Sequence, residues 1–295
     1  MDGNGSLRSR RARVARGLVG RDGELDLILA AVAAGRDLLL EGPPGTSKST
    51  ILRGITGSWG IPFVMVEGNA DLTPAKLIGH HNPARVLRED YSADNFVAGP
   101  LVAAMRDGGF LYIEEFNRAP EDTLNALLTA MAEREVVVPR VGRIAAADSF
   151  RLVASMNPFD NVGTTRISAS IYDRLCRLAI GYQAAGEEVD IVALRTSSAD
   201  RRLIGDAVAL TRATRSHPAV RLGSSVRGAI DLVLVAERLV ELRGEPGDDR
   251  ARAELILEAA LLALSGRVNL DEITEATSEQ IITEIWHTYV GADGA

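Results

Sequence analysis

The segment Gly42-Pro-Pro-Gly-Thr-Ser-Lys-Ser49 is the most informative feature of this sequence. It follows the apolar run Leu38–Leu40 and opens a segment that is compatible with a helix. A strand, a glycine-rich turn and a helix N-terminus in this order make an anion site, because unpaired backbone N–H groups and the helix dipole point at one place. In such a loop Lys48 would reach the β- and γ-phosphates of a nucleotide, and the Ser49 hydroxyl would hold Mg²⁺. The stretch therefore predicts a phosphate-binding loop.

One position of this loop departs from the strict pattern G-x-x-x-x-G-K-[ST], because Ser47 stands where the last glycine belongs. Glycine at that position lets the backbone approach a phosphate without a Cβ atom. Ser47 therefore either tightens or weakens the fit. Taken alone, the loop is also compatible with an ordinary turn before a helix.

A second segment, Phe110-Leu-Tyr-Ile-Glu-Glu115, predicts a short buried strand that ends in two carboxylates. Carboxylates near a phosphate loop can support Mg²⁺ and orient an attacking water. The two segments together favour nucleotide hydrolysis. Two solvated acids at the end of a strand are the competing interpretation.

Composition indicates a protein of two domains without a strongly basic surface. The chain has 295 residues, 46% of them hydrophobic, and its net charge of −7 gives no general attraction to nucleic acid. No apolar run reaches the length of a membrane span and no signal peptide is recognisable, which favours the cytoplasm. The single cysteine, Cys176, cannot form an internal disulfide and is expected to be a buried small hydrophobe.

The N-terminal residues 1–17 carry five arginines among glycine and serine. This composition predicts a disordered, solvated tail. A basic arm for nucleic acid or an acidic partner is the alternative, which the lack of aromatic residues for base stacking disfavours.

From residue 18 to residue 185, strands and helices alternate in the pattern of a parallel sheet that is covered on both faces. Strands are predicted at residues 37–41, 62–67, 110–114, 150–155 and 177–181, and helices at 48–57, 99–107 and 121–132. Residues 71–98 form a long insert, and residues 135–147 predict a β-hairpin. Only helical patterns follow in residues 186–295. The expected fold is an α/β P-loop NTPase domain followed by a smaller all-α lid domain.

Further motifs accompany the two segments in order along the chain. They are Phe96, Gly99-Pro-Leu101, Glu114-Glu-Phe-Asn-Arg-Ala-Pro120, Leu124-Asn-Ala-Leu-Leu128, Met156-Asn-Pro158, Asp173-Arg-Leu175 and Leu222-Gly-Ser-Ser-Val-Arg227. With these motifs the chain, from about residue 18 to residue 288, resembles the MoxR family of AAA+ ATPases. Magnesium-chelatase motor subunits and gas-vesicle ATPases share this architecture.

The resemblance implies roles for individual side chains. Glu115 would orient the attacking water, and Asn157 would hold that water or the γ-phosphate as the sensor-1 amide. Glu114 would support Mg²⁺ together with Ser49, although the family usually has the shorter aspartate there, so the metal geometry stays open. The implied nucleotide contacts are Gly42, Pro43, Pro44, Gly45, Thr46, Ser47, Lys48, Ser49, Thr50 and Arg227.

Three more side chains have a functional and an ordinary interpretation. Arg174 resembles the arginine finger that one subunit supplies to the γ-phosphate of its neighbour, with Arg166 and a plain Asp173–Arg174 surface pair as alternatives. Arg227 resembles sensor 2 of the lid and could instead be a solvated arginine. Asn69 is either a switch that turns Glu115 off or an asparagine of an ordinary turn.

The resemblance also implies partners. Residues 71–98 and 135–147 resemble the helix-2 insert and the pre-sensor hairpin, loops that line the pore of the family's rings and touch the client. The implied cofactors are ATP and Mg²⁺, and the implied assembly is a homo-oligomeric ring, most often a hexamer. The expected function is chaperone-like remodelling or maturation of a protein client, through a protein with a von Willebrand factor A domain. A nucleic-acid motor and an ATP-regulated scaffold with weak hydrolysis are the alternatives.

Overall fold

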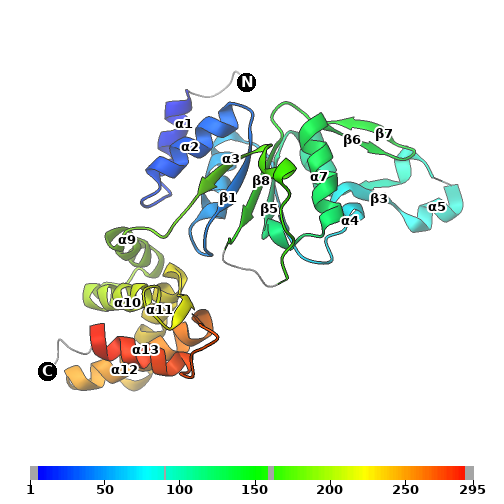
Figure 1. Ribbon diagram of the computed structural model, residues 1–295. Coiled ribbons are helices and arrows are strands. Elements are labelled where there is room, and N and C mark those ends of the chain that lie inside the picture. The colour runs from blue at the N-terminus through cyan, green and yellow to red at the C-terminus, as the bar shows by residue number, and fades with distance from the viewer. Residues whose placement is uncertain (1–5, 90, 159–162, 290–295) are drawn as a thin grey trace. The chain divides into compact units, whose positions relative to one another are not determined.

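A computed structural model describes residues 6–89, 91–158 and 163–289 of the chain (Figure 1). The chain divides into two compact units, Met1–Gly181 and Tyr182–Ala295. The first unit contains a parallel sheet, and the second is mainly helical. The division falls four residues before the domain boundary that the sequence predicts between residues 185 and 186.

The sheet of the first unit has five strands in the order β2-β5-β8-β1-β9, and every pair is parallel. All five strands begin and end within two residues of their predicted positions. Their bounds are β1 Asp37–Glu41, β2 Phe63–Glu67, β5 Phe110–Glu114, β8 Arg151–Met156 and β9 Leu175–Ala179. The central strands β1, β5 and β8 are almost entirely buried, which explains why they read as continuous apolar runs.

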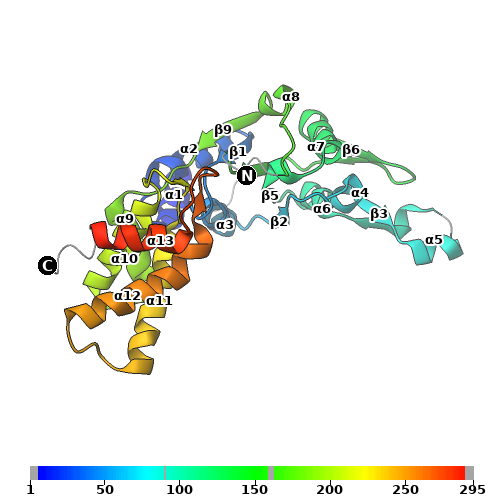
Figure 2. The same ribbon diagram turned by 60° about the horizontal axis from the view of Figure 1, so that its bottom comes forward.

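Helices cover both faces of this sheet (Figures 1 and 2). Side chains of β1 alternate between the faces, so that Leu38 and Leu40 join one core and Leu39 joins the other. The first core receives α1 Leu7–Ala15, α2 Asp22–Ala33 and α3 Lys48–Trp59. The second receives α4 Pro74–Ile78, α6 Pro100–Asp107 and α7 Glu121–Glu133.

The two insertions lie side by side at one end of the first unit (Figures 1 and 2). The insert at 71–98 contains α4, β3 Gly79–His81, α5 Pro83–Glu89, the short 3-10 helix Ala93–Asn95 and β4 Phe96–Ala98. The hairpin predicted at 135–147 is formed by β6 Glu135–Val138 and β7 Gly142–Ala145. The imidazole Nε2 of His81 lies 3.2 Å from the Pro139 carbonyl oxygen, so the insert contacts the tip of the hairpin.

The prediction of a disordered tail is wrong for its described part, because Leu7–Ala15 form helix α1. Val14 is buried against the sheet-covering helices. The guanidinium of Arg11 pairs with Asp22 at 2.6 Å and with Asp26 at 2.7 Å, both on α2. Tertiary contacts therefore stabilise a segment whose composition alone indicates disorder. Residues 1–5 of the predicted tail lie outside the described residues.

Cys176 is exposed, which corrects the prediction of a buried residue. It lies on β9, which is the edge strand of the sheet and is covered less completely than the central strands. A residue on such an edge strand can point to solvent although its neighbour Leu175 is buried.

In the described part of the second unit, residues 182–289, five α-helices pack around one core. Their bounds are α9 Ala185–Thr196, α10 Arg201–Thr214, α11 Val226–Arg243, α12 Asp249–Leu264 and α13 Ser278–Tyr289. The unit is not purely helical, since β10 Val220–Leu222 pairs with β11 Asn269–Leu270 in an antiparallel ladder that the sequence did not predict. Among the described residues, no helix has both the length and the apolar character needed to cross a bilayer.

Candidate active site

The predicted phosphate loop and carboxylates lie at one edge of the sheet. Because β1, β8 and β5 are adjacent and parallel, their carboxyl ends meet at the same edge. Gly42 follows β1, Asn157 follows β8, and Glu114 and Glu115 end and follow β5. The Gly42 amide donates to the Met156 carbonyl at 3.1 Å, which attaches the start of the loop to β8. Open α/β sheets bind their ligands at such an edge.

The ammonium group of Lys48 lies inside the loop. Its Nζ donates to the Gly42 carbonyl at 2.7 Å, the Pro43 carbonyl at 2.8 Å and the Thr46 hydroxyl at 3.2 Å. The Thr46 hydroxyl in turn donates to the Pro43 carbonyl at 2.9 Å. Lys48 is only 8% exposed, so these oxygens replace its lost hydration. The loop therefore folds around a single buried cation, which suits a polyanionic ligand.

Backbone conformation explains the departure from the strict loop pattern. Ser47 has a φ of 66° and a ψ of 15°, in the left-handed region that glycine favours. Residue 47 therefore has the backbone conformation that glycine adopts in loops of the strict pattern. Because serine has a Cβ atom, this conformation is strained. Gly42 is required for another reason, since a Cβ atom there would lie 2.0 Å from the Ile180 carbonyl oxygen.

The two carboxylates have different surroundings. Glu114 is the last residue of β5, and its backbone carbonyl accepts from the Gly68 amide at 2.7 Å. The chain then turns sharply, because Glu115 has a φ of 52°. A Cβ atom on Gly68 would lie 2.3 Å from the Glu115 carbonyl, so glycine is needed beside this turn. Strained backbone is common at functional sites, and Glu115 lies at such a position.

Sequence reasoning missed the immediate partner of Glu115. The Arg118 guanidinium Nε lies 3.0 Å from a Glu115 carboxylate oxygen, in an i,i+3 pair on the surface. The spacing of the two residues in one tight turn was the available signal. An arginine at this distance can hold the Glu115 carboxylate away from a water that it would otherwise orient.

Tyr112 supports the end of the same strand from within the core. Its hydroxyl lies 2.8 Å from the Ser155 hydroxyl of β8, which cross-links the two strands. Burial raises the pKa of Tyr112 well above its usual value, and the neighbouring Glu114 carboxylate raises it further. Tyr112 therefore stays a neutral hydrogen-bonding group near the Glu114 carboxylate.

Asn69 has the geometry of a turn residue. Its Oδ1 accepts from the Asp71 amide at 2.9 Å and its Nδ2 donates to the Glu67 carbonyl at 3.3 Å. These two local bonds occupy the amide, which favours the ordinary interpretation of this side chain over a switch.

Both candidate finger arginines lie between β8 and β9 and are exposed. Arg174 follows the short helix α8 Ala169–Tyr172 and donates to the Ser170 carbonyl at 2.8 Å. Arg166 lines a cavity of about 590 Å³ beside the ends of β1 and β8. The Asp173–Arg174 surface pair is not among the ion pairs of the described residues.

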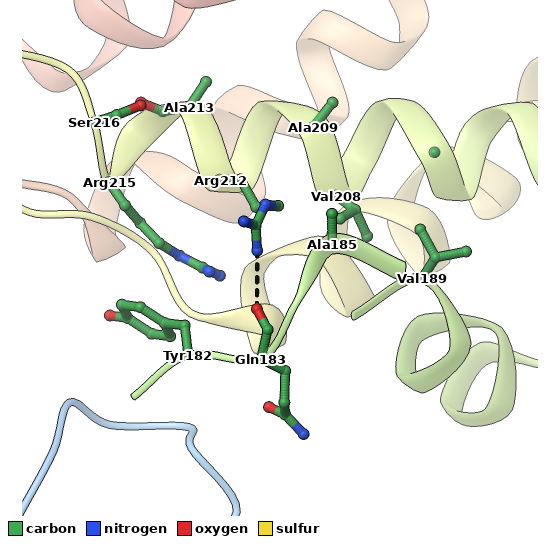
Figure 3. Close-up of a pocket in the computed structure, with 11 residues that line it drawn as sticks. Tyr182, Gln183, Ala185, Val189, Val208, Ala209, Arg212, Ala213, Arg215 and Ser216 are labelled. Atoms are coloured by element: carbon green, nitrogen blue, oxygen red, sulfur yellow. Dashed lines mark hydrogen bonds between the residues drawn. The ribbon is translucent and has the colours of Figure 1, made fainter. Parts of the chain in front are cut away.

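In the second unit, Arg227 is an exposed residue of the first turn of α11. Near the start of the same unit, a pocket of about 630 Å³ lies between α9 and α10 (Figure 3). The Arg215 guanidinium stacks on the Tyr182 ring, 3.9 Å from its centroid, and Arg212 donates to the Gln183 carbonyl at 3.0 Å. Both arginines also bind the carboxylate of Glu188, which is 2% exposed.

This cluster connects the start of the second unit to the helix that carries Arg227. The Arg215 Nε donates to the Ser224 carbonyl at 2.7 Å, and the Ser224 amide donates to the Thr214 hydroxyl at 2.9 Å. Ser224 lies three residues before Arg227. The ion pair between the buried Glu188 carboxylate and the Arg215 guanidinium, whose side chain is 12% exposed, therefore fixes the N-terminus of α11 within this unit. No local sequence pattern indicated this network.

The donors suit Mg²⁺ that is held jointly with phosphate oxygens. Among the described residues, no group of three or more His, Cys, Asp or Glu side chains could hold a metal by itself. Mg²⁺ is usually bound by one or two protein oxygens together with phosphates and waters, and Ser49 and Glu114 are oxygen donors of that kind. A bound nucleotide would therefore supply the remaining ligands.

Several known proteins and one family model are similar to this chain. Residues 37–175 match the model of the AAA domain (dynein-related subfamily). The uncharacterized protein YeaC of Bacillus subtilis is 30% identical over 249 residues, which cover 75% of this chain and 74% of YeaC. Chaperone MoxR1 of Mycobacterium tuberculosis is 31% identical over 181 residues, 61% of this chain and 45% of MoxR1. A crystal structure of a Cytophaga hutchinsonii protein shares the fold, with a TM-score of 0.53 and 22% identity over 95% of this chain and 92% of that protein.

Proposed function

Because the chain belongs to the MoxR family of AAA+ ATPases, we propose that it hydrolyses ATP and uses the energy to remodel or mature a partner protein. The observation that carries the proposal is the common sheet edge at which the Lys48 loop and the two β5 carboxylates meet. Phosphoryl transfer needs positioning and charge neutralisation more than covalent chemistry. A buried lysine in a backbone cradle beside a pair of carboxylates provides both.

Each side chain has a defined task in this proposal. Lys48 binds the β- and γ-phosphates, and Ser49 and Glu114 hold Mg²⁺, which neutralises charge on the phosphates when it is bound. Glu115 orients the attacking water once its carboxylate leaves Arg118. Asn157 at the end of β8 contacts the same water or the γ-phosphate. Arg227 is proposed to act as sensor 2.

We further propose that the enzyme works as a ring, in which the exposed Arg174 of one subunit reaches the nucleotide of the next. A guanidinium that neutralises the transition state is worth orders of magnitude in rate. The name of the relative MoxR1 supports a chaperone-like task. The ring is proposed to be a hexamer, and the client is proposed to be reached through a von Willebrand factor A domain protein.

A second function has one observation in its favour. The Glu115–Arg118 pair holds the proposed catalytic carboxylate in a contact that competes with water orientation. If that contact persists with ATP bound, the protein is an ATP-regulated scaffold with weak hydrolysis. Turnover in the presence of ATP and Mg²⁺ distinguishes the two functions.

The experiment compares the two lysines of the chain, Lys48 and Lys76. Lys48→Ala removes the cation inside the loop and should abolish ATP binding in calorimetry and hydrolysis in a phosphate-release assay. Lys76→Ala, on the exposed face of α4, is the matched control and should leave ATP binding and hydrolysis unchanged. Unchanged ATP affinity in Lys48→Ala would contradict the proposed site. Turnover that depends on added DNA would instead indicate a nucleic-acid motor.

A further inference from the structure

The carboxylate of Glu41 is a buried charge that the roles above do not use. Glu41 is the last residue of β1 and directly precedes Gly42 of the phosphate loop. Its side chain is 5% exposed. A carboxylate at that depth is costly unless it is paired and hydrogen-bonded, so its partners are informative.

Among the described residues, the side chains of Tyr172 and Arg177 bind this carboxylate, and they lie on either side of Arg174 in the sequence. The Arg177 guanidinium of β9 donates through Nε to one Glu41 oxygen at 2.7 Å, and its Nη2 atom contacts the same oxygen more closely. The Tyr172 hydroxyl of α8 lies 3.4 Å from the other oxygen. Binding to Glu41 raises the pKa of Arg177, while burial and then the Glu41 charge raise the pKa of Tyr172. Both partners therefore keep the protonated state that the pair needs.

The two residues that bind Glu41 flank Arg174 in the sequence. Tyr172 precedes Arg174 by two residues and Arg177 follows it by three. Both ends of the turn that carries Arg174 therefore contact the Glu41 carboxylate. Arg174 itself is exposed, and the bond that its guanidinium donates goes to Ser170 within the same turn. The Arg174–Ser170 bond lies within the turn and does not fix it relative to the sheet. The contacts of Tyr172 and Arg177 with Glu41 of β1 do fix it.

We propose that the Glu41–Arg177 ion pair positions Arg174 for the nucleotide site of the neighbouring subunit. This inference rests on the proposed function, in which Arg174 acts between subunits. A displacement of about 1 Å in a positioning contact can cost roughly 100-fold in rate. Since Glu41 also precedes the phosphate loop, the pair joins a subunit's own ATP loop to the arginine that it offers to its neighbour. Arg177 is therefore a positioning residue that makes no contact with ATP.

Substitution of Arg177 tests this role without opening a void in the core, and the double variant with Glu41→Gln also removes the buried charge that is left unpaired. Its side chain is 57% exposed and borders the cavity of about 590 Å³, so its removal leaves no new void in a packed interior. Arg177→Met keeps the aliphatic length and removes the charge, whereas Arg177→Lys keeps the charge and loses the two-nitrogen contact. Arg238→Met is the matched control, because Arg238 forms a surface ion pair with Glu241 on α11.

We expect Arg177→Met to lower kcat about 10-fold or more, with KM for ATP and calorimetric ATP affinity within about twofold of wild type. Arg177→Lys should retain an intermediate kcat, and Arg238→Met should match wild type. Adding Glu41→Gln to Arg177→Met should cost little more, because the two side chains act as one unit. A rise in KM at constant kcat would overturn the inference, since it would place the effect in the subunit's own loop.

Mixed rings separate this inference from the proposed function. Arg177→Met subunits, exchanged with Lys48→Ala subunits, should regain turnover, because the Lys48→Ala neighbour supplies a correctly held Arg174. Arg174→Ala subunits, exchanged with Lys48→Ala subunits, should also regain turnover for the same reason. Subunit exchange is verified with labelled protein. If turnover then returns in mixtures with Arg174→Ala but not in mixtures with Arg177→Met, the positioning role is overturned and the proposed function stays intact. Full activity of the pure Arg174→Ala protein would overturn both this inference and the assignment of Arg174 as the finger.

Discussion

Replacement of Ser47 by glycine tests whether the phosphate loop carries backbone strain. Ser47 has a φ of 66°, and a residue with a Cβ atom pays roughly 1–2 kcal/mol in the left-handed region. Glycine removes that cost but enlarges the entropy of the unfolded chain by roughly 0.4–1 kcal/mol. The net expectation is a stabilisation of about 0.5–1 kcal/mol. For a unit of this size this corresponds to an increase in Tm of about 2–4 °C per kcal/mol.

The chain contains a matched control. Ser197, the C-cap of α9, is exposed and has a φ of 57°, so Ser197→Gly relieves the same kind of strain away from the loop. Both variants should be stabilised in thermal unfolding, and only Ser47→Gly should change ATP affinity in calorimetry, towards tighter binding. Destabilisation by Ser47→Gly together with stabilisation by Ser197→Gly would contradict this expectation, because it would show that the Ser47 side chain makes a contact that stabilises more than the strain destabilises.

Further predictions concern the carboxylates and pH. Glu115→Gln should keep ATP and Mg²⁺ affinity and lose turnover, whereas Glu114→Gln should raise the Mg²⁺ concentration needed for activity; identical behaviour of the two in a Mg²⁺ titration would remove this division of roles. Burial raises the pKa of Asp200, but the Leu203 amide and the Arg252 guanidinium outweigh it and hold the pKa below its usual value. The stability from this lowered pKa is present above the unfolded value near 4 and disappears as the pH falls through the folded value. Asp200→Ala should therefore cost about 1 kcal/mol at pH 7 as a lost N-cap and less in acid, as measured by urea unfolding; an equal loss at both pH values would contradict this assignment.

The parts of the fold that follow from local pattern could be predicted. The buried strands β1, β5 and β8 are apolar runs bounded by turn residues, and their positions agree with the structure within two residues. Helix α1 could not be predicted in this way, because its order depends on Val14 packing and on Arg11 pairing with acids of α2. The pairing of β10 with β11 was also missed, since strands of two and three residues leave almost no pattern.

The same distinction applies to the candidate site. The Lys48 loop and the Glu114–Glu115 pair could be proposed from the sequence because their spacing is local and their chemistry is specific. The Glu41–Arg177 pair joins residues 136 positions apart, and only the β1–β9 strand pairing brings them together. The Glu188 cluster likewise requires the packing of α9 against α10. Long-range pairing of charges in an arginine-rich chain offers too many equivalent partners for sequence to choose among them.

ATP hydrolysis at a site shared between subunits can be tested by mixing two inactive proteins. Arg174→Ala lacks the finger and Glu115→Gln lacks the water-orienting carboxylate, so each should bind ATP and turn it over poorly. After subunit exchange, some interfaces combine an intact Glu115 with an intact Arg174 from the neighbour, and phosphate release should exceed the sum of the two parents. Arg166→Ala, mixed in parallel, shows which arginine acts. Phosphate release no greater than that sum, with exchange proven by labelled protein, would contradict the account.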